Sequence, residues 1–122
     1  MRKELENRLV NLSLQVNVLT RKFDDSFASY YYKGQIIRSS SSAAMNYGEA
    51  IGAETKKDFA HKIGIVLKEL RETYIILRII RGTDICKTAI ADLDLALDEC
   101  NQLVAIFHKT ALTLKKKNKP DL

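Results

Sequence analysis

The segment FAHKIGIVLKELRETYIILRII, residues 59–80, decides the fold. Its core-type positions recur at intervals of three and four residues, and they are Phe59, Ile63, Val66, Leu70, Thr73, Leu77 and Ile80. This spacing places the side chains along one face of an α-helix, and no strand pattern competes with it. Thr55 stands before the segment as a candidate N-cap, and Gly82 follows it where helices commonly end. The segment therefore predicts one long amphipathic helix over residues 56–81.

Two other stretches show the same spacing, one over residues 3–23 and one over residues 85–116. The first stripe consists of Leu5, Leu9, Leu12, Val16, Leu19 and Phe23. The second consists of Ala89, Leu93, Ala96, Cys100, Leu103, Phe107, Thr110 and Leu114. We therefore expect a helix over each of these two ranges.

The stretch over residues 27–51 keeps a heptad repeat, but the middle of its stripe is made of small residues. The stripe consists of Phe27, Tyr30, Gly34, Ile37, Ser41, Ala44, Gly48 and Ile51. Because small side chains let a neighbouring helix approach closely, we expect this stripe to face the core. Asp24, Asp25 and Ser26 precede it as N-cap residues.

Four helices joined by short turns predict an all-α fold, an antiparallel up-down-up-down four-helix bundle. The length of 122 residues is that of one domain. We expect this domain to cover residues 1–117. Residues 118–122 follow a run of lysines and contain Pro120, so we expect a flexible C-terminal tail there.

The sequence contains few features of membrane, metal or catalytic proteins. No apolar run reaches the roughly 18 residues that span a bilayer, and no apolar h-region follows Met1-Arg2-Lys3, so we expect a cytoplasmic protein. The two cysteines, Cys86 and Cys100, lie too far apart on one helix to form a disulfide, so we expect buried thiols. With two histidines, no Cys-x-x-Cys, no Gly-rich phosphate loop and no nucleophile-base pair, we expect no metal, no cofactor and no enzymatic activity.

Charge is spread unevenly along the chain. The 20 Lys and Arg against 15 Asp and Glu give a net charge of +5. Basic residues gather in the predicted third helix and at the end of the fourth, as Lys56, Lys57, Lys62, Lys68, Arg71, Arg78, Arg81, Lys115, Lys116 and Lys117. Such a face attracts nucleic-acid phosphates, which makes these ten residues candidates for RNA binding. The structural alternative is a solvated face whose arginines pair with acids and whose terminal lysines complement the helix dipole.

Apolar residues also extend beyond the single stripes. The excess comprises Val10, Leu14, Val18, Tyr30, Tyr31, Tyr32, Ile65, Ile75, Ile76 and Ile79. A small bundle that is apolar on more than one face usually buries the excess against another subunit, so the pattern predicts a homo-oligomer.

A line of polar residues runs beside the small-residue stripe of the second helix. Its members, with two acids expected to face them from the third helix, are Gln35, Arg38, Asn46, Glu49, Glu69 and Glu72. We predict that Arg38 pairs with at least one of the three glutamates and ties the second helix to the third or to a neighbouring subunit. Such a network more often specifies packing than chemistry, so we expect a structural role.

The same residues carry a family resemblance. The stretch QIIRSSSS (35–42) and then NYGEA (46–50) resembles the Gln-x-x-Arg-Ser and Asn-x-x-Glu pattern of the 23S rRNA intervening-sequence protein family. The resemblance is close over residues 35–82, although Ile75-Ile76 stands where the family commonly has an aromatic residue. It implies a small bacterial four-helix bundle that assembles as a ring-shaped homopentamer, in a family where most members have no assigned activity. The family's ribosomal label comes from genes inside rRNA intervening sequences.

The sequence therefore supports one leading function and two alternatives. The first is a non-enzymatic, homo-oligomeric bundle that binds RNA through the ten basic residues. The alternatives are a protein-interaction scaffold without a nucleic-acid role, or, by resemblance to a related branch, an accessory protein to a diversity-generating retroelement reverse transcriptase.

Overall fold

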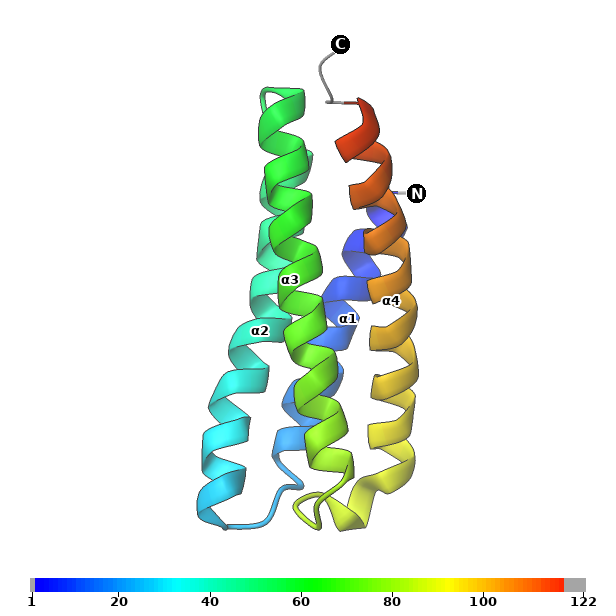
Figure 1. Ribbon diagram of the computed structural model, residues 1–122. Helices are drawn as coiled ribbons and strands as arrows, with labels where there is room; N and C mark the ends of the chain where they lie inside the picture. Colours follow the sequence, from blue (N-terminus) through cyan, green and yellow to red (C-terminus); the bar gives the residue numbers. More distant parts are fainter. Residues whose placement is uncertain (1, 118–122) are drawn as a thin grey trace.

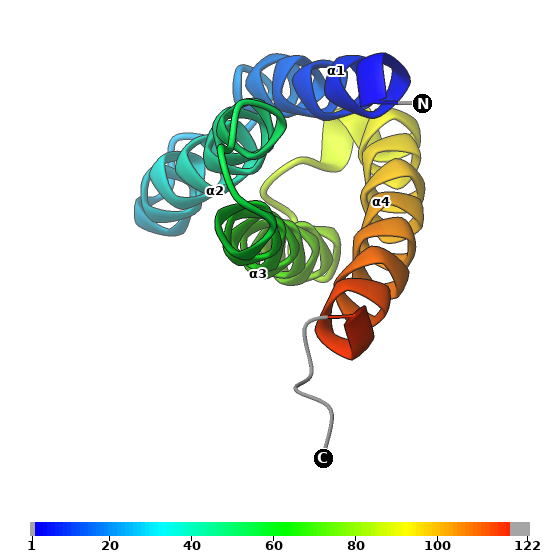
Figure 2. The ribbon, with the colours of Figure 1, turned by 90° about the horizontal axis from the view of Figure 1, so that it is seen from above.

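The computed structural model describes residues 2–117, so the tail predicted over residues 118–122 lies outside the described part. The helices are α1 (Arg2–Thr20), α2 (Phe27–Ile51), α3 (Lys56–Arg81) and α4 (Ile90–Lys117), with a short 3-10 helix η1 (Lys87–Ala89) before α4. Successive helices run in opposite directions (Figure 1), and seen from above they follow one another around the core (Figure 2). Over residues 2–117 there is no strand. The predicted antiparallel four-helix bundle is confirmed.

The core is built from the apolar faces of α1, α3 and α4 that the spacing predicts. Leu12 and Val16 of α1, Leu70 of α3, and Leu93 and Cys100 of α4 are completely buried. Further along α2 and α4, the rings of Tyr47 and Phe107 meet edge to face, with centroids 5.3 Å apart. These side chains anchor the four helices to one another.

The predicted orientation of α2 is wrong, although Ile37, Ala44 and Ile51 of the predicted stripe are partly buried against the core. Phe27 and Tyr30 are 87% and 80% exposed, while the buried residues lie one position earlier in the repeat, a rotation of about 100° around the helix. The buried residues of α2 are Ser29, Ile36, Ser39, Ser40, Ala43, Tyr47 and Ala50. Serine is tolerated in this face because its hydroxyl bonds to the helix itself, as Ser40 Oγ does to the Ile36 carbonyl at 2.8 Å.

The connections differ from the sequence prediction at two helix ends. Helix α1 ends at Thr20 rather than at residue 23, although Phe23 stays buried in the turn. Helix α4 begins at Ile90 rather than at residue 85. Ile85 and Cys86 lie in the link before it, where both are buried. The Ile85 carbonyl accepts a hydrogen bond of 2.9 Å from the Asp24 amide, which joins the α1–α2 turn to the α3–α4 link.

The starts of α2 and α3 are capped as expected. The side chain of Ser26 accepts a hydrogen bond from the Ser29 amide, and the side chain of Thr55 accepts one from the Asp58 amide. These caps satisfy backbone donors that have no partner within the first helical turn.

Candidate nucleic-acid interface

Five of the candidate RNA-binding lysines gather at one end of the bundle. Helix α3 begins and α4 finishes at this end (Figure 1), so the antiparallel topology brings Lys56 and Lys57 near the three lysines 115–117. All five side chains are exposed. Over the described residues, none of them takes part in an ion pair. We call these five residues the basic end.

The other five candidates lie further along α3, and most of them contact another side chain. Lys62 and Arg81 are paired with Glu49 and Asp94, at 3.4 and 2.8 Å. Of the rest, Arg71 contacts His108 Nδ1 at 2.9 Å, Arg78 lies over the ring of Tyr74, and Lys68 is exposed. The continuous basic face expected for the third helix is therefore interrupted by pairing.

A groove of about 430 Å³ opens at the basic end, between the α2–α3 turn and the ends of α1 and α4. Arg2, Lys56 and Lys117 supply its positive charges, and Glu54 supplies its one acid. Its apolar residues include Ile51, Phe59 and Leu114. The Arg2 guanidinium lies over the Phe59 ring, with Cζ 5.2 Å from the ring centroid, which is within cation–π distance.

Arg38 joins α2 to α3 through two acids. Its Nη1 donates to Glu69 Oε2 at 2.9 Å, and its Nη2 donates to Glu72 Oε2. The Glu69 side chain is only 9% exposed, whereas the Arg38 side chain is 49% exposed. Beside this pair, Ser39 and Thr73 share a buried hydrogen bond of 2.7 Å. The contact between α2 and α3 thus contains one nearly buried carboxylate, that of Glu69, whose described partner is Arg38.

The remaining members of the predicted polar line lie elsewhere. Glu49 is three helical turns from Arg38 and contacts Lys62, because the α2–α3 hairpin sets residue 49 opposite residue 62. Asn46 bonds within its own helix, donating to the Ser42 carbonyl at 2.9 Å. Gln35 lines a groove on the outer face of α2.

Two polar clusters were not anticipated from the sequence. Arg8 of α1 forms a bidentate pair with Glu99 of α4, and the hydrogen bond to Glu99 raises the pKa of Arg8. In the α1–α2 turn, Asp24 accepts hydrogen bonds from the Ser26 amide and the Ser29 hydroxyl, and bonds to these two serines lower the pKa of Asp24 to about 2. A signal for the first was present, since an arginine and a glutamate stand beside the core stripes of their helices. The second resembles an ordinary N-cap in sequence.

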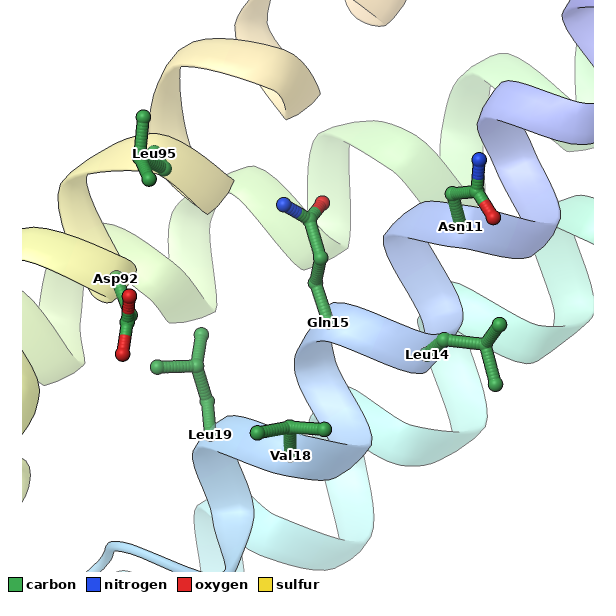
Figure 3. Close-up of a pocket in the computed structure, with 7 residues that line it drawn as sticks. All are labelled: Asn11, Leu14, Gln15, Val18, Leu19, Asp92 and Leu95. Atoms are coloured by element: carbon green, nitrogen blue, oxygen red, sulfur yellow. The ribbon is translucent and has the colours of Figure 1, made fainter.

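Apolar side chains form two separate exposed surfaces. The first is a groove of about 450 Å³ between α1 and α4 (Figure 3), lined by Leu14, Val18 and Leu19 of α1 and by Leu95 of α4. The second is a groove of about 480 Å³ on the outer face of α2, which includes Phe27, Tyr30 and Ile37. We call them the α1/α4 groove and the α2 face. Most of the excess apolar residues expected from the sequence are exposed, but Tyr32 and Ile65 are half-buried and Ile76 is buried.

Neither thiol offers a reactive site. Cys86 and Cys100 are free and buried, as the sequence predicts. Burial raises the pKa of Cys100 to about 12, and its Sγ donates to the Leu70 carbonyl at 3.4 Å. Within residues 2–117, no cluster of three or more His, Cys, Asp or Glu side chains could hold a metal ion. No helix in this range has the length and apolarity required to cross a membrane.

The fold and these surfaces define a small helical-bundle protein with one basic end and two apolar surfaces. The chain belongs to the 23S rRNA-intervening sequence protein family, whose sequence profile matches residues 4–109. A solved structure with the same fold is a protein of unknown function from the S23 ribosomal protein family of Bacteroides thetaiotaomicron. The two chains share 21% identity with a TM-score of 0.75, over 88% of this chain and 97% of that one. No curated protein matches the chain.

Proposed function

We propose that this chain is a non-enzymatic, cytoplasmic, homo-oligomeric bundle that binds RNA through phosphate contacts at its basic end. The observation that carries this proposal is the gathering of five exposed lysines, unpaired among residues 2–117, at one end of the bundle. A lysine without an acidic partner is free to neutralise a phosphate and release the counterions condensed on the nucleic acid. Paired residues such as Arg81 contribute less, because binding RNA first requires breaking the existing pair.

Oligomerisation strengthens this interaction by presenting several basic ends together. The α1/α4 groove and the α2 face are different surfaces, so a subunit that docks its α2 face into a neighbour's groove makes a head-to-tail contact. Head-to-tail contacts close into rings, whereas a twofold dimer requires one self-complementary patch. The geometry supports a cyclic oligomer, and the family resemblance suggests five subunits. In a cyclic ring, all basic ends lie on the same side.

The experiment is RNA binding measured by fluorescence anisotropy across a salt series. We expect measurable affinity at about 50 mM salt and a steep decrease as salt rises. Replacing Lys115, Lys116 and Lys117 together by Gln should reduce the slope of log K against log[salt] by about 2, given about 0.7 per phosphate contact on a single strand. The matched control replaces three basic residues toward the opposite end and outside the α2 face, Arg21, Lys22 and Lys87, and should leave the slope near that of the wild type.

The second candidate is a protein-interaction scaffold, which the open α1/α4 groove favours. Absence of RNA binding at about 50 mM salt, with the oligomer intact, would contradict the RNA proposal and leave this candidate. An equal effect of the two triple variants would instead show that net charge, and not the basic end, governs binding.

A further inference from the structure

The groove at the basic end combines features that a simple phosphate-binding surface does not require. Three cations, Arg2, Lys56 and Lys117, surround apolar side chains that include Phe59. A surface that only follows a phosphate backbone needs the charges but gains nothing from an aromatic ring in a recess. A nucleotide unit carries both parts, a flat base and an anionic phosphate.

The Arg2–Phe59 contact shows how a planar group fits this groove. The guanidinium carbon lies 5.2 Å from the ring centroid and over the ring, so the ring presents a face rather than an edge to Arg2. Arg2 is exposed in the first turn of α1, and Phe59 is half-buried in α3. Unstacked bases bind to proteins on aromatic rings and on Arg guanidinium planes. Because Arg2 covers the Phe59 ring, this groove offers a base the guanidinium plane of Arg2, with the ring behind it.

We propose that this groove takes one unpaired nucleotide of a single-stranded RNA. The base stacks on the Arg2 guanidinium, which Phe59 supports from the other side, and the adjoining phosphate lies between Lys56 and Lys117. Glu54, the acid among the lining residues, provides an acceptor for an amino group of the base or a hydroxyl of the ribose. This inference rests on the RNA-binding function proposed above and adds a preference for single strands, because the bases of a duplex are already stacked and paired.

The test compares a 15-nucleotide single strand without internal pairing and a blunt duplex of the same length, both by anisotropy. Phe59→Leu removes the aromatic face but keeps an apolar side chain. Tyr74→Leu is the matched control, because Tyr74 also lies on α3 beneath an arginine, with Arg78 Cζ 5.8 Å from its ring centroid, but lines none of the three grooves. Circular dichroism and light scattering verify that each variant keeps its fold and assembly.

We expect the wild type to prefer the single strand. Phe59→Leu should weaken single-strand binding about tenfold, because Arg2 loses the ring that holds its guanidinium in place and the loss of one base-stacking contact has an effect of this order. Duplex binding and the salt slope should stay unchanged, because no phosphate contact is lost. Tyr74→Leu should resemble the wild type with both RNAs.

The nucleotide inference is overturned if Phe59→Leu binds the single strand as the wild type does, or weakens both RNAs equally. In either case salt-dependent binding would survive, so the proposed function would stand without it. No binding of either RNA would remove both. A free nucleotide is the other possible ligand, and it is tested by titrating adenosine monophosphate while the Phe59 ring is followed by NMR. If adenosine monophosphate binds and the single strand does not displace it, the groove is a free-nucleotide site and the RNA assignment is wrong.

Discussion

Arg8 of α1 holds Glu99 of α4 in a bidentate ion pair, with Nε donating to one carboxylate oxygen at 3.0 Å and Nη2 to the other at 2.7 Å. Gln102 adds a further acceptor for Nη2 at 3.3 Å. Helices α1 and α4 have the least extensive contact of the neighbouring helix pairs, and the α1/α4 groove opens along it. The pair therefore connects the two helices where apolar packing between them is weakest.

Replacing Arg8 by Ala should lower the free energy of unfolding by about 1–2 kcal/mol, because both side chains of the pair are about three-quarters buried and the geometry is bidentate. Urea denaturation followed by circular dichroism measures this. Lys22→Ala is the control, since the Lys22–Asp92 pair also joins α1's end to α4 but is about half exposed and should contribute about 0–1 kcal/mol. Equal effects of the two substitutions would contradict the role assigned to the bidentate geometry.

Arg38→Ala should destabilise the protein by about 2 kcal/mol, between the values typical of exposed and buried pairs, because it leaves the nearly buried Glu69 carboxylate unpaired. Arg38→Met should cause a similar loss, and adding Glu69→Met to it should recover much of that loss, since the charge is then removed together with its partner. Thermal denaturation of the single and double variants checks both statements.

Lys57→Ala should change neither stability nor assembly. If Arg38→Ala leaves stability unchanged but abolishes RNA binding, Arg38 belongs to the RNA-binding surface instead.

The proposed assembly predicts a light-scattering mass well above that of one chain, about 70 kDa for five chains of 13.9 kDa. Leu14→Glu in the α1/α4 groove and Tyr30→Glu in the α2 face should each dissociate the oligomer, because each places a charge in an apolar interface. Leu112→Glu is the control, as Leu112 is an exposed apolar residue outside both surfaces. A wild-type mass of about 14 kDa at micromolar concentration would rule out the assembly.

Asp24 should contribute to acid sensitivity. Its folded pKa of about 2 lies below its ordinary value of 3.8, so the unfolded state takes up the proton first as the pH falls. Its stabilising effect is therefore complete above about pH 4 and is lost as the pH falls toward 2. Asp24→Ala should lower the melting temperature at pH 7, and the difference from the wild type should shrink steadily between pH 4 and pH 2. A difference that stays constant over this range would show that the carboxylate charge is not responsible.

The spacing of large apolar residues is sufficient to place three of the four helices. In α1, α3 and α4, a single line of residues such as Leu12, Leu70 and Leu93 is far more apolar than the rest of the helix surface, so one orientation dominates. In α2 two lines compete. Ser39 and Ala43, which face inward, are as small as Ser41 and Ala44 on the predicted line, so composition does not distinguish the two orientations. The orientation of α2 depends instead on how the face that contains Ser39 packs against α3.

The Arg38 contacts with Glu69 and Glu72 follow from helical spacing, and the exclusion of Glu49 follows from the hairpin register, which the turn at residues 52–55 already sets. The groove with Arg2 and Phe59 does not follow from any local pattern. It depends on where the first turn of α1 comes to rest beside the start of α3, a relation between distant segments that periodicity leaves undetermined.

Helix α1 reaches both of the functional surfaces proposed for this protein. Arg2, in its first turn, lies over Phe59 at the basic end, and Leu14 and Val18, three turns and more further along, line the α1/α4 groove. A continuous helix of 19 residues, about 28 Å long, moves as a rod on the scale of its own side chains. A neighbour that settles into the groove and shifts α1 along its axis therefore also shifts Arg2 relative to Phe59. We therefore expect the proposed assembly and the proposed RNA binding to be mechanically coupled through α1, although they use different regions of the bundle.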